Sequence, residues 1–202
     1  MIVIADYGLG NLKAFENIYK RLNIPCRRAA CAKDLVGATK LILPGVGAFD
    51  HAMGRLRGAD MQSALEELVL ERQVPILGIC VGMQILARSS EEGTSAGLGW
   101  LDASVERITF EGPSLPLPHM GWNSVRMEAS LPLFAGLDQD SEFYFLHSYR
   151  VRCGRPGDVI ATVDYGSRFA CAVQKGNLFG VQFHPEKSHQ SGIRVLRNFA
   201  EL

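Results

Sequence analysis

The 202-residue sequence has no excess of either charge and no long hydrophobic run. Its 21 Lys and Arg balance 21 Asp and Glu, and no block of like charges interrupts the chain. Nucleic acids and anionic membrane surfaces bind proteins with a basic face, so this balance argues against either as the main partner. No apolar stretch approaches the ~20 residues that a membrane-spanning helix needs.

Paired cysteine motifs are also missing. The five cysteines are odd in number and scattered, with no CxxC pair: Cys26, Cys31, Cys80, Cys153 and Cys171. This pattern argues against a disulfide framework or a structural zinc site and favours a reducing cytosol. The first residues have neither a basic leader nor a long apolar core, so we expect no signal peptide. We therefore expect a cytoplasmic protein without a metal site.

The first half of the sequence alternates short apolar runs with amphipathic stretches. Residues 2–5, 41–43 and 76–79 have the character of buried strands, whereas 12–22 and 61–70 show the i, i+3, i+4 spacing of helices. This order predicts parallel strands joined by crossover helices. The expected fold is therefore α/β, with three layers: a largely parallel central sheet and helices on both of its faces.

The second half is richer in strand-like segments. Hydrophobic content of 47% is ordinary for a globular protein, and no repeat, low-complexity tract or linker divides the chain, so we expect a single domain over residues 1–202. Three prolines predict a loop over 111–123. We expect strands over 105–110, 143–146, 159–163, 170–174 and 178–183, and a final amphipathic helix over 193–199.

One cysteine stands where a buried strand should end and a helix should begin. Gly78 and Gly82 flank Cys80 at the second neighbour on each side, and helical spacing of apolar residues resumes after Gly82. Strand, Gly-x-Cys-x-Gly and helix form the cysteine version of a nucleophile elbow, in which side chains at the glycine positions would collide with neighbouring backbone. A helix start at Val81 would favour the reactive thiolate. The alternative is a small buried cysteine without a chemical role.

A nucleophilic cysteine needs a base, and the base needs an orienting group. Residues 178–183 form a predicted strand that ends at His184, and Glu186 follows two positions later, so both side chains can point the same way. A carboxylate there can fix the imidazole tautomer and stabilise its charged form. One alternative makes His184, Glu186 and His189 metal ligands, and another makes His184 a surface residue at a turn.

Two glycine-rich turns follow predicted strands near the N-terminus. Pro44–Gly47 can turn backbone N–H groups toward a bound carbonyl and, with the N–H of Val81, form an oxyanion site, although Pro-Gly after a strand is often only a turn. Gly8 and Gly10 open a helix as in a dinucleotide-binding fold. Lys13 replaces the third glycine, and the acidic residue expected ~20 positions later is missing, so we expect no nicotinamide or flavin.

Together these motifs resemble the class I (triad) glutamine amidotransferases, whose fold is flavodoxin-like. The resemblance rests on residues 78–84, 44–47 and 184–186, and it covers essentially the whole chain in the family's order. Within the family, residues 118–123 and 6–12 are similar to the glutaminase subunits of imidazole glycerol phosphate synthases.

Other branches of the family fit less well. Anthranilate, GMP and carbamoyl-phosphate members usually carry His where Met83 stands, and the small glutaminase of pyridoxal phosphate synthesis lacks the signature over 119–123. This chain departs from its own branch at Val81, where Leu is usual, and over 100–103. These departures leave open a paralogous glutaminase that supplies ammonia to another acceptor, such as a surface-polysaccharide sugar.

The resemblance implies the chemistry. Cys80 would attack L-glutamine and form a thioester, His184 would act as acid and base, and Glu186 would orient His184. Val46 and Val81 would donate their N–H groups to the oxyanion, and no cofactor is required. The residues implied to hold glutamine are Gly47, Gln84, Glu92, Ser148 and Tyr149.

The resemblance also implies a partner. Ammonia would pass through a tunnel to a (β/α)8-barrel cyclase subunit that makes imidazole glycerol phosphate and aminoimidazole carboxamide ribotide in histidine biosynthesis. The positions that match the interface or gate of this heterodimer are Asn11, Trp122, Asn123, Tyr144 and Lys187.

Two alternatives belong to other functional classes. A catalytically silent scaffold could keep the fold and bind a partner, but the intact Cys80, His184 and Glu186 argue against this. A free-standing cysteine hydrolase for peptides or esters would need a specificity loop, and none can be identified in the sequence.

Overall fold

The computed structural model describes residues 1–110, 112–127 and 131–202. The described strands are β1 (Ile2–Ala5), β2 (Cys26–Ala29), β3 (Lys40–Gly45), β4 (Ile76–Cys80), β5 (Ser89–Ser90), β6 (Ala103–Arg107), β7 (His119–Met127), β8 (Glu142–His147), β9 (Tyr149–Cys153), β10 (Val159–Asp164), β11 (Arg168–Lys175) and β12 (Leu178–Val181). The α-helices are α1 (Leu12–Arg21), α2 (Phe49–Gly58), α3 (Gln62–Glu66), α4 (Val81–Gln84) and α5 (His189–Glu201). None of these described helices is long and apolar enough to cross a membrane.

The strands form one mixed sheet in the order β2-β1-β3-β4-β12-β11-β10-β7-β8. Outside this order, β9 pairs with β11, β6 pairs with β9, and β5 pairs with β6. Pairing is parallel from β2 to β12 and antiparallel from β12 to β8. The parallel part comes from the first half of the chain together with β12, which confirms the α/β prediction. The later strands build the antiparallel part.

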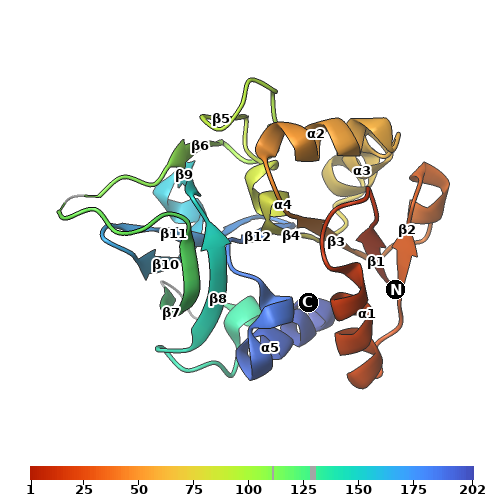
Figure 1. Ribbon diagram of the computed structural model, residues 1–202. Coiled ribbons are helices and arrows are strands. Elements are labelled where there is room, and N and C mark those ends of the chain that lie inside the picture. The colour runs from red at the N-terminus through yellow and green to blue at the C-terminus, as the bar shows by residue number, and fades with distance from the viewer. Residues whose placement is uncertain (111, 128–130) are drawn as a thin grey trace.

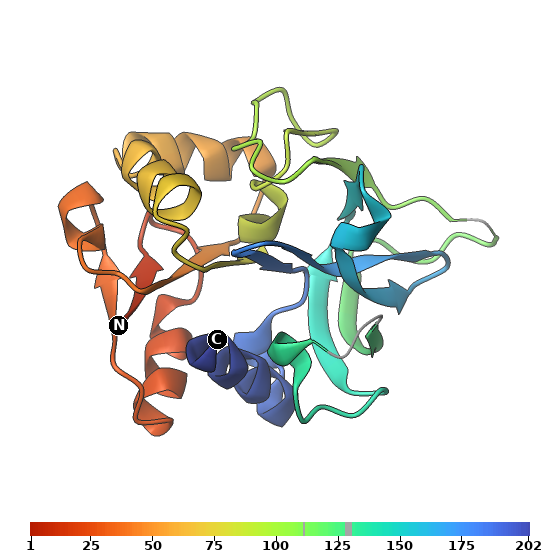
Figure 2. The ribbon, with the colours of Figure 1, turned by 180° about the vertical axis from the view of Figure 1, so that it is seen from behind.

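Helices cover both faces of the parallel part. Figures 1 and 2 show α1 and α5 together on one face, and α2, α3 and α4 on the other. Helix α1 buries Leu12, Phe15 and Ile18 against the sheet because these residues recur at helical spacing. The hydroxyl of Tyr19 in α1 donates to the Leu196 carbonyl of α5 over 3.2 Å, which links the two helices. The predicted three-layer arrangement is therefore confirmed.

Several predicted boundaries were wrong. The predicted loop over 111–123 ends earlier, because β7 begins at His119; Glu111 lies outside the described residues. The three prolines all precede β7, so none removes an N–H from its ladder. The predicted helix over 61–70 is α3 followed by one π-helical turn over Glu67–Glu71. Strands β2, β5, β7 and β9 and helix α2 were not predicted.

The strand order brings three distant parts of the sequence to one edge of the sheet. Strand β4 lies between β3 and β12, and all three are parallel. Gly45 at the end of β3 pairs with Cys80 at the end of β4, and Val181 at the end of β12 pairs with Ile79. Carboxyl ends of parallel strands are where open α/β sheets place their sites.

Two glycines make the turn after β4 possible. A Cβ on Gly82 would lie 1.9 Å from the Leu43 carbonyl oxygen of β3, and one on Gly78 would lie 2.6 Å from the Gly82 oxygen. Both obstacles are backbone atoms, which cannot move without displacing a strand. The collisions predicted from the Gly-x-Cys-x-Gly spacing are thus confirmed.

We predict that Gly82→Ala lowers the free energy of unfolding by about 1–3 kcal/mol, because the added methyl group must push α4 away from β3. The matched control is Gly54→Ala on α2, where the new Cβ meets nothing within 4 Å. This control should raise stability by roughly 0.5–1 kcal/mol, because Gly is a poor helix former. Urea unfolding of both variants measures the difference, and equal stabilities would contradict the packing argument.

Candidate active site

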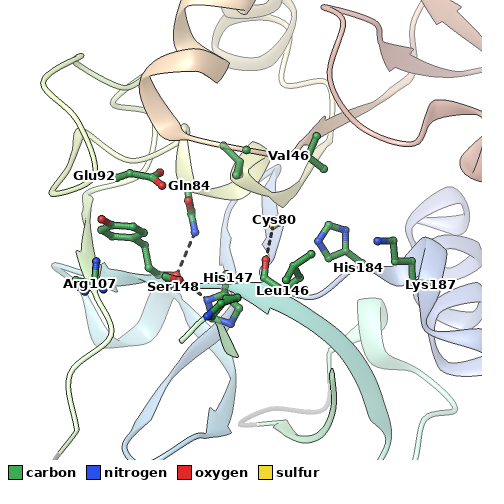
Figure 3. A pocket seen from close by; sticks show the side chains of 14 residues that line it. Val46, Cys80, Gln84, Glu92, Arg107, Leu146, His147, Ser148, His184 and Lys187 are labelled. Atoms are coloured by element: carbon green, nitrogen blue, oxygen red, sulfur yellow. Dashed lines mark hydrogen bonds between the residues drawn. The ribbon is translucent and has the colours of Figure 1, made fainter. Parts of the chain in front are cut away.

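A pocket of about 380 Å³ opens at the carboxyl ends of β3, β4 and β12 (Figure 3). It gathers side chains that come from separate elements of the fold. The residues predicted from the sequence that line it are Val46, Gly47, Cys80, Val81, Gln84, Glu92, Ser148, Tyr149, His184 and Lys187. Arg107, Pro118, Leu146 and His147 complete the lining.

Cys80 ends β4 in a strained backbone conformation. Its φ of +55° lies in the left-handed region that L-residues rarely adopt, as a nucleophile elbow requires. The thiol is nearly buried and donates a long hydrogen bond to the Leu146 carbonyl oxygen, with 3.9 Å between the atoms. Helix α4 has only four residues, so its dipole is small. The nearby backbone N–H groups therefore contribute more than this dipole to the electrostatic environment of the Cys80 sulfur.

His184 forms hydrogen bonds through both of its ring nitrogens. Nδ1 lies 2.9 Å from Glu186 Oε1, which leaves Nε2 to the Cys80 thiol, the ring's other hydrogen-bond partner. Burial by itself lowers the pKa of His184, but the hydrogen bonds and charges of Cys80 and Glu186 outweigh it and raise that pKa to about 10. The three side chains therefore form an ordered thiol–imidazole–carboxylate chain.

Strand β8 holds the segment that carries His184. The His184 N–H donates to the Tyr144 carbonyl over 2.8 Å, and the Ser188 hydroxyl donates to the His184 carbonyl over 2.6 Å. The same hydroxyl accepts from the Tyr144 N–H over 3.0 Å. Since Phe143 of β8 also stacks on Phe183, the imidazole is attached to a rigid strand.

Tyr7 fixes the end of β3, directly before the turn that carries Val46 and Gly47. The buried Tyr7 hydroxyl donates to the Pro44 carbonyl, and burial, with a smaller contribution from Cys80, raises the Tyr7 pKa far above its usual range. A Cβ on Gly45 would lie 2.4 Å from the Gly82 nitrogen, so the end of β3 and the turn after β4 are in direct contact. Val46, 40% exposed, follows directly and lines the pocket with Val81.

A second group of residues lines the pocket away from the thiol. Gln84 Nε2 donates to the Tyr149 carbonyl over 3.2 Å. Figure 3 marks this bond with a dashed line that starts at Gln84. Glu92 accepts from the Phe49 N–H at the start of α2 over 2.8 Å. The guanidinium of Arg107 lies 5.9 Å from the Tyr149 ring centre. One carboxylate and one guanidinium thus face a shared space.

Comparison with known proteins identifies the family of this site. The family described as "Glutamine amidotransferase class-I" matches residues 16–202. The chain belongs to the class I glutamine amidotransferases. Proteins named "Imidazole glycerol phosphate synthase subunit HisH" are 54% identical in Bdellovibrio bacteriovorus and 48% identical in Leptospira interrogans, each over the full length of both chains.

Solved structures agree on the fold of this amidotransferase. A crystal structure of a glutamine amidotransferase has a TM-score of 0.76 at 22% identity and covers all of both chains. A putative GMP synthase subunit from Thermoplasma acidophilum has a TM-score of 0.72 at 23% identity, covering 99% of this chain and 92% of that one. At these identities the likeness supports the fold alone.

The residues predicted for a partner interface of the amidotransferase differ in their surroundings. Trp122 is 44% exposed and stacks on His189, with ring centres 4.9 Å apart, and Lys187 lies 5.3 Å from the Tyr144 ring centre. Asn11 caps α1, accepting from the Ala14 N–H over 3.3 Å. His189 is thus engaged with Trp122, and within the described ranges it forms no metal-binding group with His184 and Glu186.

Sequence reasoning missed several polar residues of the amidotransferase. Gln182 is fully buried, donates to the Cys80 sulfur over 3.6 Å and accepts from Gln84 over 3.0 Å. Its signal was a glutamine inside an otherwise apolar strand-like run. His119 and His147 are also buried. His119 belongs to the family signature over 118–123, but nothing in the local sequence indicates that either histidine is buried. Asn123, predicted for the interface, directs its amide inward to His119.

We predict that Glu186→Gln lowers the pKa of His184, because it removes the carboxylate that helps raise it. Because the pKa of His184 in the folded protein lies above its unfolded value of about 6.5, protonation of His184 stabilises the folded state. This stabilisation is fully present below pH 6.5 and is lost as the pH rises toward 10. An NMR pH titration of the imidazole measures the shift. Glu92→Gln, in the same pocket but bonded to α2, should leave the His184 pKa unchanged.

Proposed function

We propose that this chain is a glutaminase subunit that hydrolyses L-glutamine to glutamate and ammonia and delivers the ammonia to a synthase partner in histidine biosynthesis. The observation that carries the proposal is the chain of contacts from Cys80 through His184 to Glu186 at the wall of a pocket. Full-length relatives at 54% and 48% identity are named as subunits of imidazole glycerol phosphate synthase.

The proposed reaction assigns each group one role at a time. The Cys80 sulfur attacks the side-chain amide carbon of glutamine, and the proton of its thiol passes to His184. The N–H groups of Val46 and Val81 stabilise the oxyanion, each such donor being typically worth roughly 3 kcal/mol of barrier. The C–N bond breaks as His184 protonates the leaving ammonia. A glutamyl thioester then remains on the sulfur.

Water completes the cycle. His184 takes a proton from water, whose oxygen attacks the thioester carbon, and the returning proton restores the thiol as glutamate leaves. Glu186 accepts from His184 Nδ1 throughout and stabilises the imidazolium form. The raised His184 pKa suits this ring for holding the proton while the thiolate attacks.

The charges in the pocket suit the head group of a free amino acid. Glu92 can pair with the α-ammonium group, and Arg107 with the α-carboxylate, while the side-chain amide extends toward Cys80. Gly47, Gln84, Ser148 and Tyr149 line the same pocket and would hold the rest of the glutamine molecule. A peptide substrate lacks one or both of these terminal charges, so the pocket favours free glutamine over a peptide.

A partner would receive the ammonia before water protonates it. Four apolar side chains near the pocket are exposed for such large residues: Met120 at 64%, Trp122 at 44%, Val46 at 40% and Leu146 at 38%. We propose that they face a (β/α)8-barrel cyclase subunit, with Tyr144 and Lys187 at the ammonia gate and Asn11 at the rim. We also propose that residues 1–202 form one domain and that the protein is cytoplasmic.

We predict that Cys80→Ala lowers glutamine hydrolysis by at least about 10⁴-fold, because it removes the attacking atom. The assembled complex should still form product from added ammonium salt, since the partner's site is intact. Glutamate release and product formation are measured separately. Cys31→Ala, which changes an exposed cysteine, is the control and should retain both activities. Glutamine turnover by the Cys80 variant would refute the proposed function.

We predict that Trp122→Ala weakens association with the cyclase by about 2 kcal/mol, a roughly thirtyfold higher Kd, because exposed tryptophans commonly anchor interfaces. Titration calorimetry measures the Kd, and thermal unfolding should change little. Leu70→Ala is the control, since Leu70 is equally exposed, at 45%, but precedes β4 at the opposite edge of the sheet. An unchanged Kd for the Trp122 variant would exclude its interface role.

A further inference from the structure

Two buried histidines link the proposed glutamine pocket to the outer strands. His119 at the start of β7 lies opposite His147 at the end of β8, and His119 Nδ1 is 3.1 Å from His147 Nε2. His147 Nδ1 lies 2.8 Å from the Tyr149 carbonyl oxygen. Asn123 Nδ2 lies 3.2 Å from His119 Nε2 and 2.9 Å from the Asp164 carbonyl oxygen.

The chemistry of these atoms sets the direction of every bond. A carbonyl oxygen only accepts, so His147 Nδ1 carries the proton that it shares with Tyr149. A neutral His147 then has a bare Nε2, which accepts from His119 Nδ1–H. His119 Nε2 is bare in turn and accepts from the Asn123 amide, whose second N–H reaches Asp164. When the pair is neutral, both rings are therefore Nδ1–H tautomers.

The surroundings of the rings keep them neutral. His119 stacks on Phe145 and on Tyr165, with ring centres 4.6 and 4.1 Å apart. Burial lowers the pKa of His119 to about 4 and is the main cause that lowers the pKa of His147 to about 3. Both rings are therefore uncharged near neutral pH, and the pair can keep one fixed set of hydrogen bonds.

The hydrogen bonds continue from the Tyr149 carbonyl to the Cys80 sulfur. The Tyr149 carbonyl accepts from both His147 and Gln84, one bond for each lone pair. The second amide N–H of Gln84 reaches Gln182, whose own amide donates to the Cys80 sulfur over 3.6 Å. His119 and His147 thus lie at one end of a continuous hydrogen-bond network and Cys80 at the other, and the two halves meet at the Tyr149 carbonyl, which accepts from both.

We propose that His119 and His147 are positioning residues: locked as Nδ1–H tautomers by Asn123, they hold the Tyr149 carbonyl and, through it, the Gln84 side chain in the shape that binds glutamine. This role rests on the proposed function only for the identity of the ligand. It also assigns Asn123 to the network, in place of a direct contact with a partner.

The tautomers are tested first, without any ligand. In the ¹⁵N-histidine-labelled chain at pH 7, long-range ¹H–¹⁵N NMR spectra should show two neutral rings protonated on Nδ1, the reverse of the usual Nε2–H form. His119→Phe and His147→Phe assign the two signals. Protonation of either ring on Nε2, or a charged form of either at pH 7, would overturn the proposal whatever the protein's substrate is.

Binding of L-glutamine to the Cys80→Ala chain then separates positioning from packing. His119→Asn keeps a donor in the place of Nδ1 but loses the stacked ring, and it should retain the Kd within about twofold. His119→Phe keeps the ring but leaves His147 Nε2 without a donor, and it should raise the Kd about three- to tenfold. Calorimetry measures both, with thermal unfolding as the check on folding.

A positioning role and a packing role predict opposite orders of glutamine affinity for the Asn and Phe variants of His119. If His119 only fills space, the Phe variant binds as well as the parent chain and the Asn variant binds worse, and the positioning role is refuted. If the parent Cys80→Ala chain binds no glutamine at all, the proposed function fails, while the NMR result still decides whether the fixed tautomers exist.

Discussion

The contact between the Cys80 thiol and the His184 imidazole is the interaction on which the rest of the site depends. It joins residues 104 positions apart in the sequence, and it exists because β4 and β12 are parallel neighbours that end at the same edge. Glycine at positions 78 and 82 lets the chain turn within this crowded edge, where a Cβ would strike backbone. The strained φ of Cys80 therefore serves the same contact.

Around this contact the protein uses buried hydrogen bonds more than charge. Glu186 fixes one nitrogen of His184, Tyr7 holds Pro44 near the end of β3, and Gln182 reaches the sulfur from the position directly after β12. Each bond joins groups shielded from water, where an unpaired polar atom is costly and a paired one is well ordered. The site is thereby preorganised before a substrate arrives, which is how electrostatic stabilisation of a transition state becomes effective.

The antiparallel strands add a second layer of support. Strands β7 and β8 present exposed Met120, Trp122 and Leu146 on the surface, and they place His119 and His147 in the interior. Alternation along a strand produces this division, since successive side chains point to opposite faces. The same two strands can therefore meet a partner and, through their buried histidines, hold the wall of the proposed glutamine pocket.

Local patterns in the sequence determined the parallel core, the elbow at Cys80 and the His184–Glu186 pair, because strand runs, glycine spacing and a two-residue offset are short-range signals. Only the tertiary structure decided the partners of Tyr7, Gln182 and His119, which come from distant parts of the sequence, and the orientation of His147 toward the nearby Tyr149 carbonyl. It also showed that Asn123 turns inward and that β7 starts immediately after the last proline of its loop. Burial and hydrogen-bond direction depend on which strands become neighbours, and no local pattern specifies that.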